Sequence, residues 1–127
     1  MTPKNKKLLL TDLCARLPYG VIVEDRNGIH ELTTWNAEFT DLLYNSKCNI
    51  KPYLFPLSSM TEEQKNDCPI NETTLNIINS NIGCYGIIEI PWRLSFLFID
   101  WCNKNHFDYR GLIPMDLAID ATGLNIY

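Results

Sequence analysis

The segment from Pro91 to Lys104 constrains the fold more than any other part of this sequence. Apolar side chains fill most of its positions, and its polar residues Arg93, Asp100 and Lys104 share one narrow stripe. Pro91 suits the first turn of a helix, where its missing N–H group leaves no bond unmade. Because a helix that is apolar nearly all round is buried on several sides, we expect residues 91–104 to form a central helix of the core.

An amphipathic helix is also indicated near the start of the chain. Its apolar residues recur at the three- and four-residue spacing of one helix face. They are Leu9, Leu10, Leu13, Cys14 and Leu17. Pro18 favours extended backbone at the residue before it, so this helix should end by Leu17.

A β-hairpin is expected next. The β-branched run from Gly20 to Asp25 is followed by Asn27 and Gly28, a pair typical of tight hairpin turns, and then by a second arm over residues 29–35. Both faces of the second arm mix polar and apolar side chains. The pattern therefore predicts a strand without showing which of its faces is buried.

The middle of the chain gives weaker signals. Residues 38–44 favour a third strand over a helical turn. Residues 50–56 contain two prolines, which favours an edge strand or an extended crossing over a central strand. Ser59 and Glu62 match a capping box, in which a hydroxyl and a carboxylate satisfy free backbone N–H groups, and predict a short helix just after it.

Three further segments are assigned from composition. Residues 71–81 are rich in asparagine and weakly periodic, which indicates a marginal element. Residues 87–90 read as a short extended piece before the central helix. Residues 107–120 contain Gly111 and Pro114 as breakers, so they should be mostly extended or looped.

These elements together predict a single α+β domain over residues 1–127. No internal repeat, glycine-serine linker or block of charge marks a boundary in the 127 residues. The expected architecture is a short antiparallel sheet, built on the hairpin and covered by the N-terminal helix and the buried C-terminal helix.

Charge and hydropathy exclude several classes of protein. Fifteen acidic residues against eleven basic ones give a net charge of -4, which disfavours a nucleic-acid partner because duplex binding depends on neutralising phosphates. The cluster Lys4, Lys6 and Lys7 is a small exception that reads as a solvated patch. The start of the chain lacks the apolar core of a signal peptide, and no apolar run approaches the roughly 20 residues of a membrane span. We therefore expect a cytoplasmic protein with no membrane partner.

The five cysteines are expected to be free thiols with no metal or other cofactor. They are odd in number, widely spaced and never arranged as a Cys-x-x-Cys pair. Two alternatives stay open. Cys84, Cys102 and His106 could supply part of a zinc site, and Cys102 with His106 and Asp108 could form a thiol nucleophile with its base.

Three blocks of the sequence resemble a known family. The blocks are residues 13–21, 51–63 and 105–115. They are similar to small uncharacterised proteins encoded by anaerobic gut bacteria and by their prophages and tailed phages. In that family the position of Phe55 is more often arginine and that of Asp116 more often glycine. The resemblance implies a mobile-element or gut-bacterial context and no particular activity.

Candidate partner-binding residues form two aromatic clusters. Phe107, Tyr109 and Arg110 follow the central helix, and Tyr53 with Phe55 lies between prolines. Tyrosine and arginine are enriched among residues that dominate protein–protein binding. The alternative is structural: the aromatic rings belong to the core and Arg110 pairs with a nearby carboxylate.

We therefore expect a non-enzymatic interaction or accessory protein, whose partner is a host or phage protein. A small enzyme with a Cys/His site is the main alternative, and a nucleic-acid accessory protein is a weaker one. A polar pocket that holds Cys102 and His106 would favour the enzyme. An exposed aromatic patch would favour the interaction protein.

Overall fold

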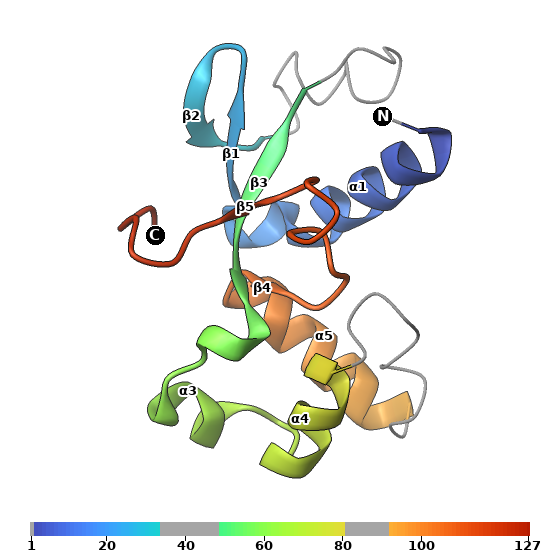
Figure 1. Ribbon diagram of the computed structural model, residues 1–127, viewed down its shortest axis with the longest axis vertical. Helices are drawn as coiled ribbons and strands as arrows, with labels where there is room; N and C mark the ends of the chain where they lie inside the picture. Colours follow the sequence, from blue (N-terminus) through green and yellow to red (C-terminus); the bar gives the residue numbers. More distant parts are fainter. Residues whose placement is uncertain (1, 34–48, 81–91) are drawn as a thin grey trace.

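The computed structural model describes residues 2–33, 49–80 and 92–127 and confirms the α+β class (Figure 1). The expectations for residues 38–44 and 87–90, and for Trp35, Cys48, Cys84 and Pro91, fall outside the described residues. The helices are α1 (Pro3–Arg16), α3 (Glu62–Asp67), α4 (Glu72–Ser80) and α5 (Trp92–Lys104). The strands are β1 (Ile22–Asp25), β2 (Gly28–Glu31), β3 (Lys51–Pro56), β4 (Phe107–Asp108) and β5 (Ile119–Asp120).

The sheet is mixed, whereas the sequence suggested an antiparallel one. Strand β1 pairs antiparallel with both β2 and β3, while β4 and β5 each pair parallel with β3. Figure 1 shows β3 crossing the molecule, with β1, β2 and α1 around its first half and the helices α3, α4 and α5 around its far end.

Strand β3 is central, so the prediction of an edge strand was wrong. Its partners change along its length: β1 lies opposite Lys51 and Pro52, β5 opposite Tyr53 and Leu54, and β4 beside Phe55 and Pro56. Each proline therefore stands near an end of the strand, where the ladder does not need an N–H group from it.

The hydroxyl of Tyr127 joins β1 to β3 beyond their last backbone pair. It accepts a hydrogen bond from the Ile22 N–H group at 2.9 Å and donates one to the Tyr53 carbonyl at 2.7 Å. The register that pairs Val23 with Pro52 would bring Ile22 opposite Tyr53 next. The phenol thus bridges the place where the two strands separate. Burial raises the pKa of Tyr127 to about 12, so the hydroxyl keeps the proton that this bridge needs.

The hairpin of β1 and β2 is confirmed, with its turn one residue earlier than expected. Asp25 pairs with Gly28, so the loop residues are Arg26 and Asn27. Gly28 has φ 105°, a conformation that side chains with a Cβ atom rarely adopt. The glycine is therefore needed after the turn rather than within it.

Local capping explains where the shorter helices begin. Thr61 and Gln64 form the capping box of α3, two residues beyond the predicted pair, while the Ser59 hydroxyl bonds to the Pro56 carbonyl. The Asn71 side chain accepts from Thr74 N–H at 2.8 Å, so the asparagine-rich segment forms helix α4 rather than a marginal element.

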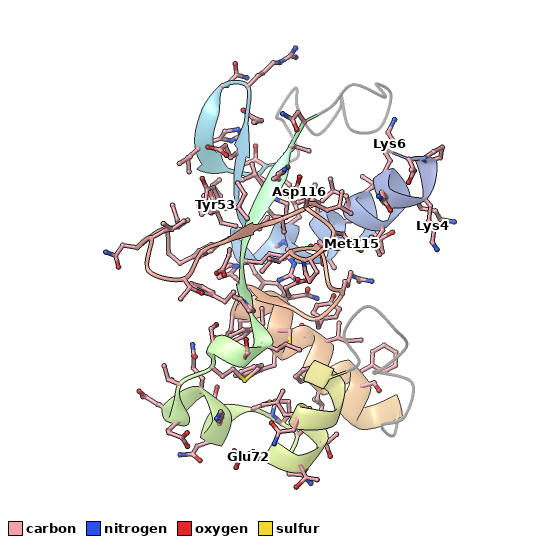
Figure 2. The ribbon with its side chains drawn as sticks, viewed as in Figure 1. Lys4, Lys6, Tyr53, Glu72, Met115 and Asp116 are labelled. Carbon is pink, nitrogen blue, oxygen red and sulfur yellow. The ribbon has the colours of Figure 1, made fainter. Side chains whose placement is uncertain are left out.

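Helix α1 also agrees with the sequence. Thr2 caps it, and it ends at Arg16, before a short 3-10 turn over Leu17–Tyr19. Lys4 and Lys6 leave this helix in different directions, as Figure 2 shows, because residues two apart lie on opposite faces. Lys4 and Lys6 therefore do not lie on one face of α1.

Over residues 95–104, whose burial the structure describes, helix α5 is buried along one face and exposed along another, so the prediction of burial on several sides is wrong for this part of the helix. Phe98, Cys102 and Asn103 lie in the interior, whereas Phe96 and Leu97 are exposed. The chain is too small to surround this helix, so part of its apolar surface faces solvent.

Two apolar clusters form the core. The first is built on α1, β1, β3 and the segment 112–118, and the second on α4, α5, β4 and the residues that flank α3. Arg16 connects them. Its Nε donates to Asp12 at 2.7 Å, and its Nη2 donates to the Phe107 carbonyl of β4 at 2.7 Å. Both side chains of this ion pair have 0 % exposure.

The substitution Asp12→Asn tests this buried ion pair. It keeps the size of the side chain but leaves the Arg16 charge without its counter-charge, so unfolding should become easier by about 3 kcal/mol. Denaturant titration measures the change. The matched control is Asp116→Asn, which removes an exposed carboxylate bonded to Lys51 and should cost less than about 1 kcal/mol. Equal losses in the two variants would contradict the role given to Asp12.

Candidate functional site

Most of the aromatic residues singled out from the sequence lie in the core. Phe107, Tyr109 and Tyr53 are all buried, and Phe55 is half-buried. Buried rings cannot anchor a partner unless the core opens. The alternative reading of the sequence, that these rings are core residues, fits the structure better for Phe107, Tyr109 and Tyr53.

Arg110 is also hydrogen-bonded within the protein. Its Nε donates to the Asp12 carboxylate at 3.1 Å, and its Nη2 donates to the Tyr109 hydroxyl at 3.1 Å. The guanidinium carbon lies 4.9 Å from the centre of the Tyr109 ring, and that of Arg16 lies 5.3 Å from it. Tyr109 therefore lies within cation–π distance of two arginines that share one carboxylate, and Arg110 closes this network toward solvent.

Cys102 and His106 do not form a nucleophile with its base. Cys102 is fully buried, and burial raises the pKa of its thiol well above the usual value, so the reactive thiolate is disfavoured. Burial, assisted by the Arg16 charge, lowers the pKa of His106 to about 4. Within the described part of the chain no hydrogen bond joins the two side chains.

Asp108 does not orient His106 either. Its carboxylate accepts the backbone N–H groups of Leu112 and Ile113 at 2.9 Å each, which fixes the turn after β4. Burial raises the pKa of Asp108. His106 instead stacks on Tyr127, with 3.7 Å between ring centres. The geometry thus gives Cys102, His106 and Asp108 separate structural contacts.

No metal site is formed by the described residues. Among residues 2–33, 49–80 and 92–127, no three His, Cys, Asp or Glu side chains are close enough to hold an ion. Cys84, the further ligand considered from the sequence, is outside these ranges.

A pocket between α3 and α5 is the best candidate for a binding site. Its volume is about 490 Å³. It is lined by Glu63, Gln64, Asn66, Asp67, Trp101 and Asn105. Four of these residues come from α3, whose start the capping box fixes, and two come from the end of α5 and the residue just after it. A short capped helix is thereby placed against a long one so that polar side chains face an indole ring.

Trp101 is the apolar wall of this pocket, and neighbouring groups hold it in place. Its Nε1–H donates to the Asp67 carboxylate at 2.9 Å. Its ring stacks on Phe107 with 5.3 Å between centres and 9° between planes, and Phe107 in turn contacts Phe55 at 6.1 Å. Phe107 and Phe55, two of the aromatic residues chosen from the sequence, thus pack behind the indole ring that lines the pocket.

The pocket carries a negative charge. Glu63 and Asp67 supply two carboxylates, and none of the described residues that line the pocket is basic. The nearby Lys65 pairs with Glu62 at 3.5 Å and with Glu72 at 3.8 Å. Within the described residues neither Glu63 nor Asp67 has a cation within ion-pair distance. Any ligand of this pocket must therefore tolerate or neutralise two acidic groups.

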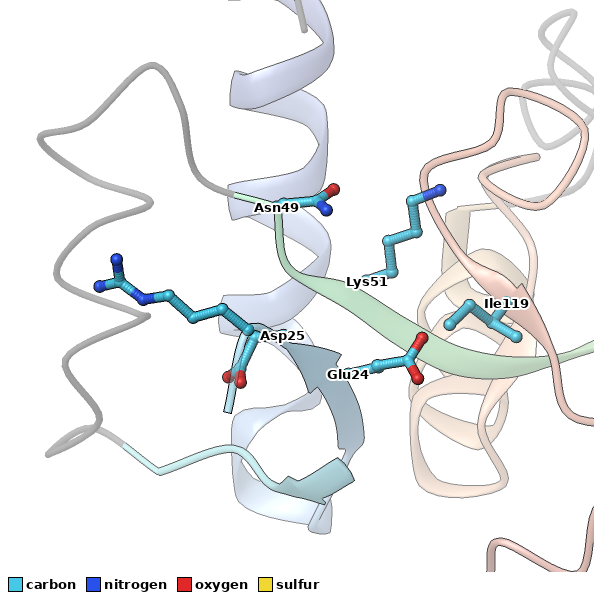
Figure 3. Close-up of a pocket in the computed structure, with 6 residues that line it drawn as sticks. Glu24, Asp25, Asn49, Lys51 and Ile119 are labelled. Atoms are coloured by element: carbon cyan, nitrogen blue, oxygen red, sulfur yellow. The ribbon is translucent and has the colours of Figure 1, made fainter. Parts of the chain in front are cut away.

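A second pocket lies beside the hairpin and is electrically balanced (Figure 3). Its volume is about 420 Å³, and it is lined by Glu24, Asp25, Arg26, Asn49, Lys51 and Ile119. Its charged groups already have partners: Asp25 bonds to His30 at 2.5 Å, and Lys51 bonds to Asp116 at 2.9 Å. Burial, together with the negative charge of the nearby Glu24 carboxylate, raises the pKa of Tyr53. The charged groups of this pocket are therefore less available to a ligand than those of the α3/α5 pocket.

The residues of the α3/α5 pocket are not predicted as a site by the sequence. Trp101 was assigned to the core because its helix is so apolar, and Asp67 precedes it by 34 residues. The sequence signal for this site is Trp101 at the edge of the apolar face, followed four residues later by Asn105 on the same side of the helix. Their acidic partners on α3 could not be found from spacing.

Comparison with known proteins adds no relative. No family model, curated protein or solved structure matches this chain. In the described residues we also find no helix with the length and apolar character required to span a bilayer.

The low pKa of His106 predicts a pH dependence of stability. Folded His106 stays neutral down to about pH 4, whereas the unfolded chain protonates it below about pH 6.5. Stability should therefore fall as the pH drops through this window, by up to about 3 kcal/mol. Urea titration at several pH values measures the loss.

The variant His106→Asn isolates this effect. Asparagine tolerates the φ of 63° at this position and does not titrate. Contributions from other groups, including Asp108, are shared and cancel when the two pH profiles are subtracted. A profile for the variant as steep as that of the wild type would show that His106 is not the cause.

Proposed function

We propose that this chain is a non-enzymatic protein that binds another protein through the outer face of α5. The exposed apolar pair on that face carries the proposal. Phe96 and Leu97 keep 69 % and 52 % exposure although both are large apolar side chains. Neighbouring exposed apolar groups are costly in water and are characteristic of binding surfaces.

The rest of the site supports binding rather than catalysis. Cys102 is buried, His106 has a low pKa, and the described residues that line the α3/α5 pocket include no nucleophile next to a base. The resemblance of three sequence blocks to small proteins of gut bacteria and their phages supports a host or phage protein as the partner.

Replacing the exposed pair tests the proposed function. The double variant Phe96→Ser/Leu97→Ser should unfold within about 1 kcal/mol of the wild type, since more than half of each side chain is exposed. Its capture of the natural partner from the lysate of the native cell should fall about tenfold or more, because the apolar contact is lost. Quantitative mass spectrometry of the retained proteins gives this ratio.

Leu124→Ser is the matched control. Leu124 has 50 % exposure but lies near the end of the chain and not on α5. This variant should retain the partner as the wild type does. Wild-type capture by the double variant, or an equal loss with Leu124→Ser, would refute the assignment to α5.

A further inference from the structure

We infer that the α3/α5 pocket receives an arginine side chain of the partner protein, an inference that rests on the proposed function. Trp101 supplies an aromatic surface, Glu63 and Asp67 supply two carboxylates, and Asn105 adds an amide. A planar cation with several N–H donors matches this combination.

The negative charge of the pocket favours a cation as its ligand. Both carboxylates belong to exposed residues at the rim of the pocket, and the lysine of the same helix is paired with Glu62 and Glu72. A cation entering the pocket would therefore be the first counter-charge that Glu63 and Asp67 meet among the described residues. Close approach of opposite charges favours binding most when part of the contact is shielded from water.

The fixed position of the Trp101 ring favours a guanidinium group over an ammonium group as that cation. Phe107 stacks on the indole, and Asp67 accepts its N–H group, so the ring is fixed before any ligand arrives. Arginine stacks on aromatic rings and donates in a planar fork to carboxylates, whereas a lysine ammonium is a compact and strongly hydrated charge. A preformed aromatic wall beside carboxylates thus favours arginine.

Leu97, one of the exposed apolar pair, lies about one helical turn before Trp101 along α5. Leu97, Trp101 and Asn105 are spaced by four residues and so lie on the same side of the helix. Four residues span about 6 Å along a helix axis. A partner segment would therefore place an apolar side chain against Leu97 and an arginine over Trp101, a separation that residues two apart in an extended strand provide.

An NMR titration with two short peptides tests the inference. The first probe is acetyl-leucyl-glycyl-arginine amide, and the second replaces arginine by citrulline, which has the same shape without the charge. The arginine peptide should shift the resonance of the Trp101 Nε1–H group in a saturable way. The citrulline peptide should bind at least about fivefold more weakly, because the charge interaction is lost.

The double variant Glu63→Gln/Asp67→Asn provides the second arm. The amide oxygen that this variant carries at position 67 can still accept the Trp101 N–H bond, so the wall stays in place. Affinity for the arginine peptide should fall about fivefold or more. Glu62→Gln is the matched control, since Glu62 is an exposed acid of the same helix that does not line the pocket, and it should change the affinity less than about twofold.

Three results would overturn the inference. These are equal affinity for the two peptides, an unshifted Trp101 resonance, and equal effects of the Glu62 variant and the pocket variant. The proposed function fails separately, when partner capture does not depend on Phe96 and Leu97. Capture that depends on this pair while the peptides do not bind would refute the arginine site and leave the interaction function standing.

Discussion

Arg16 carries a full positive charge inside the protein, and the arrangement of the two core clusters depends on how that charge is satisfied. Asp12 neutralises it one helical turn earlier, and the Phe107 carbonyl binds it from a strand 91 residues away. Removing a charge from water costs several kcal/mol unless partners replace the lost hydration. Any shift of β4 away from α1 would therefore leave a buried cation poorly bonded, so the pair fixes where β4 lies.

The position of β4 in turn sets the candidate site. Phe107 is the side chain that stacks on Trp101, and Phe55 packs behind it. The aromatic row from β3 to α5 thus links the core to the acidic pocket of α3 and α5. A binding surface built this way needs little reorganisation when a partner arrives, because its apolar wall is already held by packing and by one hydrogen bond.

The sequence predicted local features well and long-range ones poorly. The end of α1 near Leu17 and the hairpin were predicted, because both depend on residues close in sequence. Leu17 nevertheless keeps right-handed helical backbone before Pro18 and enters a 3-10 turn, so the extended conformation expected there was wrong. The central place of β3 was missed, since its prolines argue against pairing until the change of partner along the strand is known. The exposed face of α5 was missed for a similar reason: composition cannot show how much of a helix the rest of a small chain is able to cover.

Arg16 connects the two core clusters. Native-state hydrogen exchange tests this connection most directly. In the wild type, the backbone N–H groups of Leu13 in the first cluster and Phe98 in the second should exchange with the same opening free energy, because the clusters open together. In Arg16→Met the two values should separate by about 1 kcal/mol or more, since the bond to Phe107 is gone. Equal values in the variant, or unequal values in the wild type, would contradict the account.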